Sequence, residues 1–358
     1  MIALGLMSGT SADGIDAALI QTDGDTQCRV LDHGGVPYPD ELSKKIKSHF
    51  GKPGDPKDLQ DLSDAITRFH AEYVQQFIGK TEHRPDIIGF HGQTVFHDPD
   101  NGQTVQLGDG KSLSSVTGID VVNDFRSADI QAGGQGAPFL PLYHRALVLR
   151  DGVDLPVVIL NLGGVANVTW IGQGGIEDIL AFDTGPANAL LDDWMINKAG
   201  ASHDENGRIA RKGTVHETRL SNWLQDDYFQ KTPPKSLDRQ NWKDCDVSDL
   251  SVEDGAATLT EFTARSVAQA AAHFPRPPLK WYATGGGRKN SFLMERLTAC
   301  LRPAHLSDVE ELGWNGDTLE AEGFAYLAVR SVKNLPLSVP GTTGVSRPIN
   351  GGVLWKAP

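Results

Sequence analysis

Short apolar runs alternate with glycine-rich polar turns along most of the chain, and two longer stretches show helical spacing. Residues 59–78 and 256–274 place apolar side chains three and four positions apart, which predicts two helices. Residues 86–94 (DIIGFHGQT) and 157–164 (VVILNLGG) are apolar runs that end in polar residues, as buried strands do. Residues 280–297 predict a strand, a glycine turn and a helix.

One strand-turn-strand pattern occurs twice. Residues 4–20 (LGLMSGTSADGIDAALI) and residues 157–171 (VVILNLGGVANVTWI) both place a glycine-containing polar turn between two apolar runs. A pattern repeated half a chain apart predicts an α/β protein of two related domains. We expect the boundary between residues 135 and 156 and assign 1–135 to the first domain and 136–358 to the second, with the extreme C-terminus packing back on the first.

Composition narrows the choice of partners. The chain has 358 residues, 39% of them hydrophobic, which suffices for two domains. Acidic residues outnumber basic ones by 46 to 33, a formal net charge of −13. Such a surface repels nucleic acid and anionic membranes, so we expect a small-molecule substrate. An anionic substrate would need a local group of Arg, Lys or backbone N–H donors.

Cysteine usage and the N-terminus indicate a cytoplasmic protein. The three cysteines are far apart and form no CxxC pair, so neither a disulfide framework nor a zinc site is predicted. The N-terminus has no basic region before its apolar run, unlike a secretory signal. No apolar run reaches the roughly 20 residues that cross a bilayer.

The first polar turn has two interpretations. Its Gly9 to Gly14 spacing starts like a Walker loop, but Ile15 and Asp16 stand where Lys and Ser/Thr are needed, and no GxGxxG follows. It is either a hairpin turn whose donors receive phosphate, with Asp13 and Asp16 holding a hydrated Mg²⁺, or a plain hairpin with Asx-type turn residues. The candidate nucleotide-binding residues are Gly9, Thr10, Ser11, Ala12, Asp13, Gly14, Ile15 and Asp16.

Polar residues also follow two other predicted strands. His91 and Gln93 follow the apolar run of residues 86–90, and Asp124 and Arg126 follow a run that ends at residue 122. Ligands gather at the carboxyl ends of strands in α/β sheets, and an arginine can bind a carboxylate or phosphate with two hydrogen bonds. Each residue has a structural alternative, but two such clusters together favour a binding site.

Asp183 follows the apolar run 180–182 and precedes Thr184, Gly185 and Pro186, with a helix predicted from about Pro186. A carboxylate at a strand end is suited to act as a general base, and its structural alternative is the N-cap of that helix. Thr184 would serve as a cap equally well, which favours a catalytic role for Asp183. Asn167 lies in the preceding glycine-containing hairpin.

Three consecutive glycines, Gly285, Gly286 and Gly287, end a predicted strand before a helix. A tight corner needs one glycine, whereas three let a ring or a phosphate approach the backbone, beside a helix N-terminus that favours anions. We therefore predict nucleotide contact there. Glu322 is predicted on the inward face of a later helix, where a charge requires a partner or a function.

Six of these segments together resemble the anhydro-N-acetylmuramic acid kinases. They are GLMSGTSADGIDAAL, FHGQT, NDFRSADIQAGGQGAP, NLGGVANVT, FDTGPANALLD and TGGGRKN, in the family's order from residue 4 to about residue 330. That family belongs to the superfamily of sugar kinases, actin and Hsp70 chaperones. The resemblance implies an α/β fold of two ribonuclease-H-like (actin-like ATPase) domains with ATP and sugar in the cleft between them.

The resemblance also implies the reaction. ATP, with Mg²⁺, and water would convert 1,6-anhydro-N-acetylmuramic acid to N-acetylmuramic acid 6-phosphate in peptidoglycan recycling, with Asp183 as the base that deprotonates water. The turn Gly9–Asp16 and the glycines Gly285–Gly287 would contact the nucleotide, and a cytoplasmic homodimer is expected. Candidates around the sugar are His91, Gln93, Asp124, Arg126, Asn167 and Glu322, with Arg126 assigned to the lactyl carboxylate.

The chain departs from the family pattern at two small residues, Ala12, where Leu is common, and Ala187, where Gly is common. Neither change removes a polar group. Two other functions remain as alternatives: a different sugar or acid kinase of the same superfamily, and a nucleotide-dependent sugar sensor without turnover. Such sensors often carry a DNA-binding domain, which the acidic charge does not favour.

Overall fold

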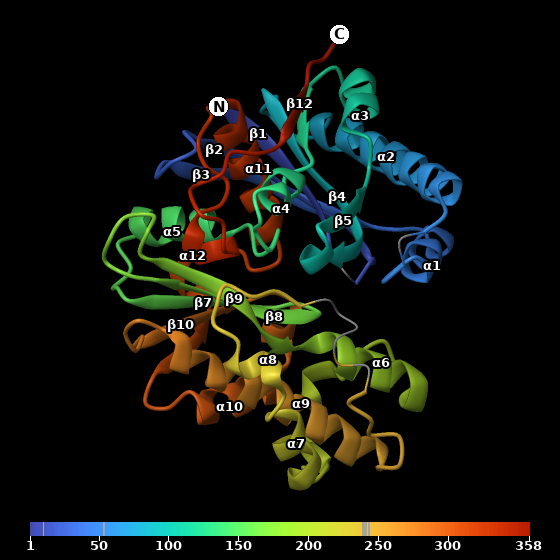
Figure 1. Ribbon diagram of the computed structural model, residues 1–358. Helices are drawn as coiled ribbons and strands as arrows, with labels where there is room; N and C mark the ends of the chain where they lie inside the picture. The colour runs from blue at the N-terminus through green and yellow to red at the C-terminus, as the bar shows by residue number, and fades with distance from the viewer. Residues whose placement is uncertain (10, 53, 238–241, 243) are drawn as a thin grey trace. The chain divides into compact units, whose positions relative to one another are not determined.

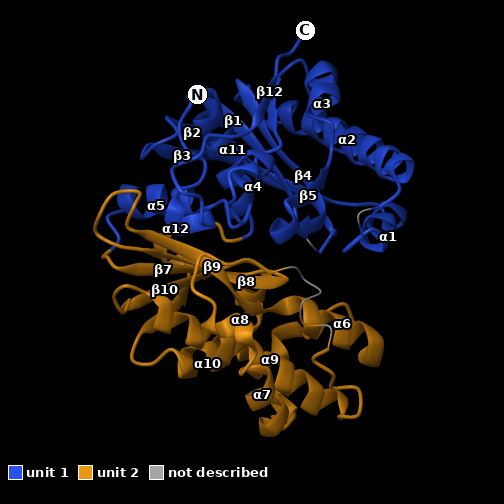
Figure 2. Cartoon of the chain, viewed as in Figure 1, with its two compact units in different colours: residues 1–153, 317–358 blue, residues 154–316 orange. Residues whose placement is uncertain are grey.

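The computed structural model describes residues 1–9, 11–52, 54–237, 242 and 244–358, which form two compact units. Unit 1 comprises residues 1–153 and 317–358, and unit 2 comprises residues 154–316 (Figure 2). This division differs from the predicted boundary after residue 135. Helix α5 (Pro141–Arg150) contacts strand β3 and helix α11, so it belongs to unit 1 rather than to the second domain.

Unit 1 is built around one mixed sheet, with the order β12-β6-β4-β1-β2-β3 and β5 paired to β4. Strands β1, β2 and β3 are antiparallel neighbours, β4 and β6 are parallel to β1, and β12 is antiparallel to β6. The strands are β1 Ile2–Ser8, β2 Gly14–Thr22, β3 Cys28–Pro37, β4 Ile87–Asp98, β5 Gln103–Leu107, β6 Asp120–Asn123 and β12 Val353–Trp355. The helices are α1 Asp40–Ser48, α2 Pro56–Ile78, α3 Gly110–Thr117, α4 Ser127–Gln131, α5, α11 Leu319–Val332 and α12 Pro340–Thr343, with the 3₁₀ turn η1 at Pro99–Asn101 (Figure 1).

The two faces of β1 bury different partners because successive side chains point to opposite sides of a sheet. Leu4 and Leu6 are fully buried in the same core cluster as the apolar face of α2. Gly5, between them, faces α11, and a Cβ there would overlap the backbone of Ala321. Gly89 on β4 has the same relation to Phe324. These two glycines therefore let α11 lie directly against the sheet.

Unit 2 repeats this plan with its own sheet, in the order β11-β10-β7-β8-β9. Strands β7, β8 and β9 are antiparallel neighbours, and β10 and β11 are parallel to β7. The strands are β7 Val157–Leu162, β8 Val165–Ile171, β9 Ile179–Pro186, β10 Lys280–Thr284 and β11 His305–Asp308. The helices are α6 Asn188–Ala199, α7 Glu217–Trp223, α8 Asp227–Gln230, α9 Val252–Ala270 and α10 Ser291–Cys300, with 3₁₀ turns η2 Glu205–Gly207, η3 Ala210–Lys212, η5 Ala271–His273, η6 Gly286–Lys289 and η7 Val309–Leu312.

The predicted repeat is thus present as topology. In each unit three antiparallel strands begin the sheet, and the next two core strands are added in parallel on the other side of the first strand. In unit 2, α9 and α10 bury apolar side chains against β7, β8 and β10.

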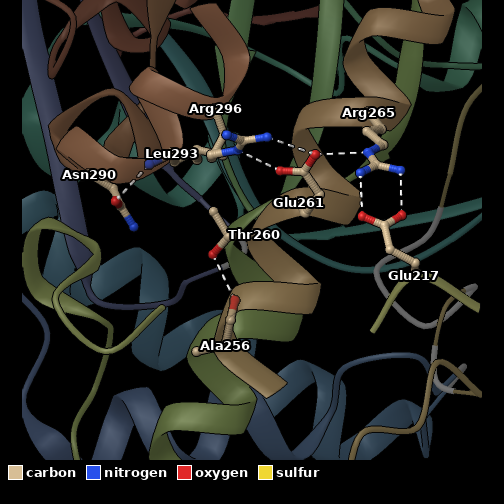
Figure 3. Close-up of polar contacts among 8 residues, drawn as sticks. All are labelled: Glu217, Ala256, Thr260, Glu261, Arg265, Asn290, Leu293 and Arg296. Carbon is tan, nitrogen blue, oxygen red and sulfur yellow. Dashed lines mark hydrogen bonds and ion pairs between the residues drawn. The ribbon is translucent and has the colours of Figure 1, made fainter. Parts of the chain in front are cut away.

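Ion pairs also connect helices α7, α9 and α10 of unit 2 (Figure 3). Glu261 of α9 is 2% exposed and accepts hydrogen bonds from Arg265 on the same helix and Arg296 on α10, at 2.7–2.8 Å for the closest contacts. Arg265 also forms a two-pronged pair with Glu217 of α7. Burial alone would raise the pKa of Glu261, but the hydrogen bonds from the two arginines outweigh it and lower that pKa.

Both predicted long helices are present, and each begins earlier than the apolar spacing indicates. Helix α2 starts at Pro56 because the Asp55 side chain accepts two N–H bonds as N-cap, and α9 starts at Val252 behind the Ser251 cap. Helix α9 ends at Ala270 and continues as the 3₁₀ turn η5. Within the described part of the chain, no helix is long and apolar enough to cross a membrane.

Candidate functional site

The turn after β1 is a β-hairpin turn, as predicted, and its conformation is fixed by Gln93. The Ser8 hydroxyl donates to Gln93 Oε1 at 2.6 Å, and Gln93 Nε2 donates to the carbonyls of Gly9 at 3.0 Å and Thr94 at 3.3 Å. Gln93 is fully buried. The structure thus brings this predicted sugar ligand to the hairpin turn, where it supports the backbone.

The turn itself presents polar groups on its exposed side. Ser11 and Asp13 are exposed and share a 2.6 Å hydrogen bond, and Asp16 is exposed on β2. Gly9 has no positive φ, and among the described residues a Cβ there would meet only the Ser11 hydroxyl at 3.8 Å. The described part of the fold therefore has room for a side chain at this position.

The remaining turn residues anchor the hairpin. Ala12 is fully buried with a positive φ of 47°, and its carbonyl accepts the Ser43 hydroxyl at 2.6 Å. Gly14 and Ile15 belong to β2, where a Cβ at Gly14 would overlap the backbone of Val36. The predicted ligand Thr10 lies outside the described residues.

The buried His91 on β4, the strand next to β1, is paired with the half-buried Arg126. Arg126 donates from one terminal nitrogen to His91 Nε2 at 3.0 Å and from the other to the Gly136 carbonyl at 2.6 Å. The other ring nitrogen of His91 lies 2.9 Å from the Gly92 carbonyl, so it carries the proton. Burial first, and the Arg126 charge second, lower the pKa of His91 well below its usual value.

One sequence prediction about β4 is corrected here. His91 and Gln93 were expected at the end of a strand, but β4 continues to Asp98 because residues beyond Gln93 pair with β5. Both side chains therefore lie in the middle of β4. A register irregularity between Thr94 and Phe96 marks the point where the strand changes partner.

Asp124 follows β6 with a positive φ of 50°, and its Oδ1 accepts the Ser127 hydroxyl at 2.6 Å.

The next turn of the chain is held by Asp129, which is 1% exposed. Asp129 accepts hydrogen bonds from the Gly136 N–H at 2.8 Å and from Ser338 and Thr343 of the C-terminal segment. The loop that binds Arg126 is thus fixed by residues two hundred positions later in the chain.

Glu322 is buried on α11, as predicted, at 2% exposure. Its two oxygens accept hydrogen bonds from Tyr143 at 2.6 Å and from Thr318 at 3.0 Å. Burial raises the pKa of Glu322, and these two hydrogen bonds oppose the rise. These contacts tie Glu322 to Tyr143 and Thr318 within unit 1.

Asp183, in unit 2, is buried and fixed by the segment 235–237. Its Oδ2 accepts the Leu237 N–H at 2.7 Å, its own N–H donates to the Lys235 carbonyl at 3.0 Å, and its carbonyl accepts the Tyr228 hydroxyl at 2.5 Å. The residue as a whole is 6% exposed. This set of contacts holds both the backbone and one side-chain oxygen.

Two expectations about Asp183 differ from the structure. It lies within β9, which continues to Pro186, rather than at a strand end, because residues 185 and 186 still pair with β8. Helix α6 begins at Asn188, and its N-cap Ala187 makes no side-chain cap bond. Neither Asp183 nor Thr184 caps the helix, so the structural alternative for Asp183 is wrong.

Asn167 and the glycine turn complete the unit 2 group. Asn167 on β8 pairs in register with Asp183 and with Asn161 of β7. Gly285 has a φ of 78°, and a Cβ on Gly285 or Gly287 would clash with β7 or Asn188. Gly286 is exposed, and a Cβ there meets nothing within 4 Å. The packing of the described residues therefore requires glycine at Gly285 and Gly287, whereas it would admit a side chain at Gly286.

Sequence reasoning missed Tyr228, Lys235 and Leu237. They lie 45 to 54 positions from Asp183 in a stretch whose prolines indicate only turns, so no local pattern could pair them with it. The structure brings the predicted residues together as two groups. In unit 1, Gln93 joins the Gly9 turn and His91 joins Arg126. In unit 2, Asp183 joins Asn167.

The repeated sheet topology, three antiparallel strands extended in parallel from the first, defines the class as a duplicated ribonuclease-H-like protein, the actin-like ATPase fold of sugar kinases. Solved structures with similar arrangements include an activator of 2-hydroxyisocaproyl-CoA dehydratase from Clostridium difficile, with bound ADPNP (13% identity, TM-score 0.45, 93% of this chain and 96% of that one). Another is a ROK family glucokinase from Streptomyces griseus (14% identity, TM-score 0.41, 92% and 99%).

The family follows from the sequence comparisons. The family model "Anhydro-N-acetylmuramic acid kinase" matches residues 1–357. Relatives of that name include those of Rhizorhabdus wittichii, 48% identical over 99% of both chains, and Paramagnetospirillum magneticum, 49% identical over 98% of this chain and 99% of the relative. The chain belongs to the anhydro-N-acetylmuramic acid kinase family, an ATP-dependent kinase family.

Proposed function

We propose that this enzyme hydrolyses the 1,6-anhydro bond of 1,6-anhydro-N-acetylmuramic acid and phosphorylates the freed 6-oxygen, giving N-acetylmuramic acid 6-phosphate. The observation that carries the proposal is the Asp183 carboxylate, which is buried and held in place by the Leu237 N–H. A carboxylate fixed in this way is suited to general base catalysis.

Asp183 accepts a proton from water as the water oxygen bonds to the anomeric carbon. The bond from that carbon to the 6-oxygen breaks, and the electron pair stays on the 6-oxygen. That oxygen then bonds to the γ-phosphorus of ATP as the bond to the bridging β,γ-oxygen breaks and ADP leaves with its electron pair, and Asp183 returns its proton to solvent. The hydrogen bond from Leu237 holds the carboxylate for the first of these steps.

The hairpin turn of unit 1 is assigned to the phosphates. Exposed N–H groups in such a turn form a concavity for anions, and Gly9 leaves room for close approach. Asp13 and Asp16 fit Mg²⁺ by donor type, since it prefers oxygen ligands and binds through one or two carboxylates, water and substrate phosphate. Mg²⁺ would neutralise phosphate charge there. In unit 2, Gly286 is assigned to the nucleotide.

The sugar is assigned to His91, Asp124, Arg126, Asn167 and Glu322, with Gln93 supporting the turn between sugar and phosphates. The charge of Arg126 suits the lactyl carboxylate, and neutral His91 orients that guanidinium by accepting its hydrogen bond at Nε2. We infer a cytoplasmic homodimer, as the family resemblance implies.

The experiment is turnover on two matched sugars. With ATP and Mg²⁺, the enzyme should convert the 1,6-anhydro sugar to the 6-phosphate and release one ADP per sugar. The reducing sugar N-acetylmuramic acid, which already has a free 6-hydroxyl, separates this function from an ordinary sugar kinase. Turnover of the reducing sugar alone would indicate a different sugar kinase of the same superfamily. ATP binding with turnover of neither sugar would indicate a nucleotide-dependent sugar sensor.

A single variant tests the base. Asp183→Asn keeps the size of the side chain and removes the basic oxygen, so kcat should fall by at least about 10³-fold while ATP still binds with unchanged affinity. Asp178→Asn, a half-buried aspartate in the turn before the same strand, is the matched control and should retain its turnover. Retained turnover in Asp183→Asn would exclude Asp183 as the base.

A further inference from the structure

Lys235 is a buried lysine that lies next to Asp183 in the hydrogen-bond pattern. It is 6% exposed, and its hydrogen bonds to described residues go to the carbonyls of Tyr228 at 2.8 Å and Phe229 at 3.3 Å, with the His273 ring at 3.5 Å. Its ammonium group lies 4.6 Å from the centre of the Tyr228 ring. A buried ammonium is costly, so lysine is a rare choice here unless the contact matters.

The contacts of Lys235 close a ring around Asp183. The ammonium holds the carbonyl of Tyr228 at the end of α8, and the hydroxyl of the same Tyr228 holds the Asp183 carbonyl at 2.5 Å. The main chain of Lys235 accepts the Asp183 N–H, and Leu237, two residues on, donates to the carboxylate. The position of the Leu237 N–H therefore depends on where Lys235 ties segment 235–237.

A simple structural role would not need this lysine to be buried. Lys231, four residues earlier and exposed, lies on the same turn after α8 and could reach helix-end carbonyls at no desolvation cost. Lys235 instead places its charge between the rings of Tyr228 and Phe182, and Phe182 directly precedes Asp183. Phe182, which precedes Asp183 in the chain, and Tyr228, which bonds to its carbonyl, thus both contact one ammonium group.

We propose that Lys235 is a positioning residue for the catalytic base: it fixes segment 235–237 to α8, so that the Leu237 N–H holds the Asp183 carboxylate in its working orientation. The proposal rests on the proposed function, in which Asp183 is the base. The effect of Lys235 is on orientation, so it belongs to kcat and not to the binding of either substrate.

The test compares Lys235→Met, which keeps length and loses the donor, with Lys235→Gln, which keeps a neutral donor. In the full-length enzyme, Lys235→Met should lower kcat by about 10- to 100-fold with KM for sugar and ATP within about threefold, and Lys235→Gln should lose less than Lys235→Met. A kcat within about twofold of wild type in Lys235→Met, or a loss confined to KM, would overturn the proposal.

Two further variants keep the test decisive. Lys231→Met, the exposed lysine of the same segment, should leave kcat unchanged. If Lys235→Met does not fold, Tyr228→Phe decides, since it removes only the hydroxyl bond to Asp183: a kcat loss of about threefold or more at constant KM supports the proposal, and a smaller one overturns it. Asp183→Asn is measured alongside. If it stays active, the proposed function fails; if it is inactive while Lys235→Met is normal, only this inference fails.

Discussion

Arg126 donates a hydrogen bond to Nε2 of His91 at 3.0 Å, so this histidine is held as a neutral ring between a guanidinium group and the Gly92 carbonyl. A protonated ring could not accept that bond, and its charge would face that of Arg126. The binding surface we assign to the sugar carboxylate therefore depends on a histidine that does not titrate near neutral pH.

The first prediction concerns the stability of unit 1 at acidic pH. Burial lowers the pKa of His70 and His97 to about 4 and that of His144 to about 3. It also lowers the pKa of His91 well below 6.5. All four lie in unit 1. Because the unfolded chain binds protons at about pH 6.5 and the folded chain does not, stability is full above pH 6.5 and is lost as pH falls towards 4.

For His70 and His97, the shift from 6.5 to about 4 is worth roughly 3 kcal/mol each at pH 4. Urea unfolding between pH 7 and pH 4.5, followed by hydrogen exchange in residues 1–153, should show unit 1 weakening. His70→Phe, which keeps the ring among Tyr38 and Phe90, should make this pH dependence shallower. An unchanged slope in that variant would contradict the prediction.

The second prediction separates two adjacent glycines. Gly286→Ala should change the free energy of unfolding by less than about 1 kcal/mol, because its Cβ meets nothing within 4 Å. It should raise KM for ATP by about tenfold, or about 1.4 kcal/mol of binding free energy. Gly287→Ala places a Cβ 2.8 Å from that of Leu162 and should instead cost about 1–3 kcal/mol of stability. Steady-state kinetics and thermal unfolding of both variants check this; equal effects on KM would contradict it.

The third prediction concerns the ion cluster of Figure 3. Glu261→Gln leaves Arg265 and Arg296 without their buried partner and should lower the stability of unit 2 by about 2–4 kcal/mol. Glu217→Gln, whose side chain is 60% exposed, should cost at most about 1 kcal/mol. Since the pKa of Glu261 is lowered on folding, its contribution is present above about pH 4.5 and is lost as pH falls below it. Denaturant unfolding at pH 7 and pH 4 measures both.

The fourth prediction follows from Lys235, whose pKa burial lowers to about 8 from 10.5, with the charge of Lys231 as the smaller cause. Between pH 8 and pH 10.5 the unfolded chain holds a proton that the folded chain does not. The wild type should therefore gain stability relative to Lys235→Met as pH rises through this window. Paired urea titrations at pH 7.5 and pH 10 test the sign; a relative loss of stability at the higher pH would contradict it.

Local pattern was sufficient for the turns and not for the strand ends. The hairpin after β1 and the strand-turn-helix around Gly285 follow from apolar runs and glycines, and both are present. Asp183 was placed at a strand end because the apolar run stops at Phe182, yet pairing with β8 continues the ladder through Gly185. Hydrogen bonds to a neighbouring strand thus override the turn preference of an Asp-Thr-Gly-Pro segment.

The supports of the candidate site were beyond local prediction for another reason. Asp129 depends on Ser338 and Thr343, and Asp183 depends on Leu237, so each contact closes a long loop of chain. Spacing along the sequence carries information about one element, not about which distant loop returns to it. The family resemblance supplied the roles of the residues that contact substrate, while their supports emerged only from the folded chain.

The return of the chain to unit 1 after residue 316 sets an order of events during synthesis. Helix α11, which covers Gly5 and Gly89, leaves the ribosome only after all of unit 2 has been made. The inserted unit can therefore finish folding first, while the N-terminal sheet waits with one face uncovered. For this protein a segment translated after unit 2 completes the domain begun before it, and until then the waiting sheet is exposed to chaperones and to aggregation.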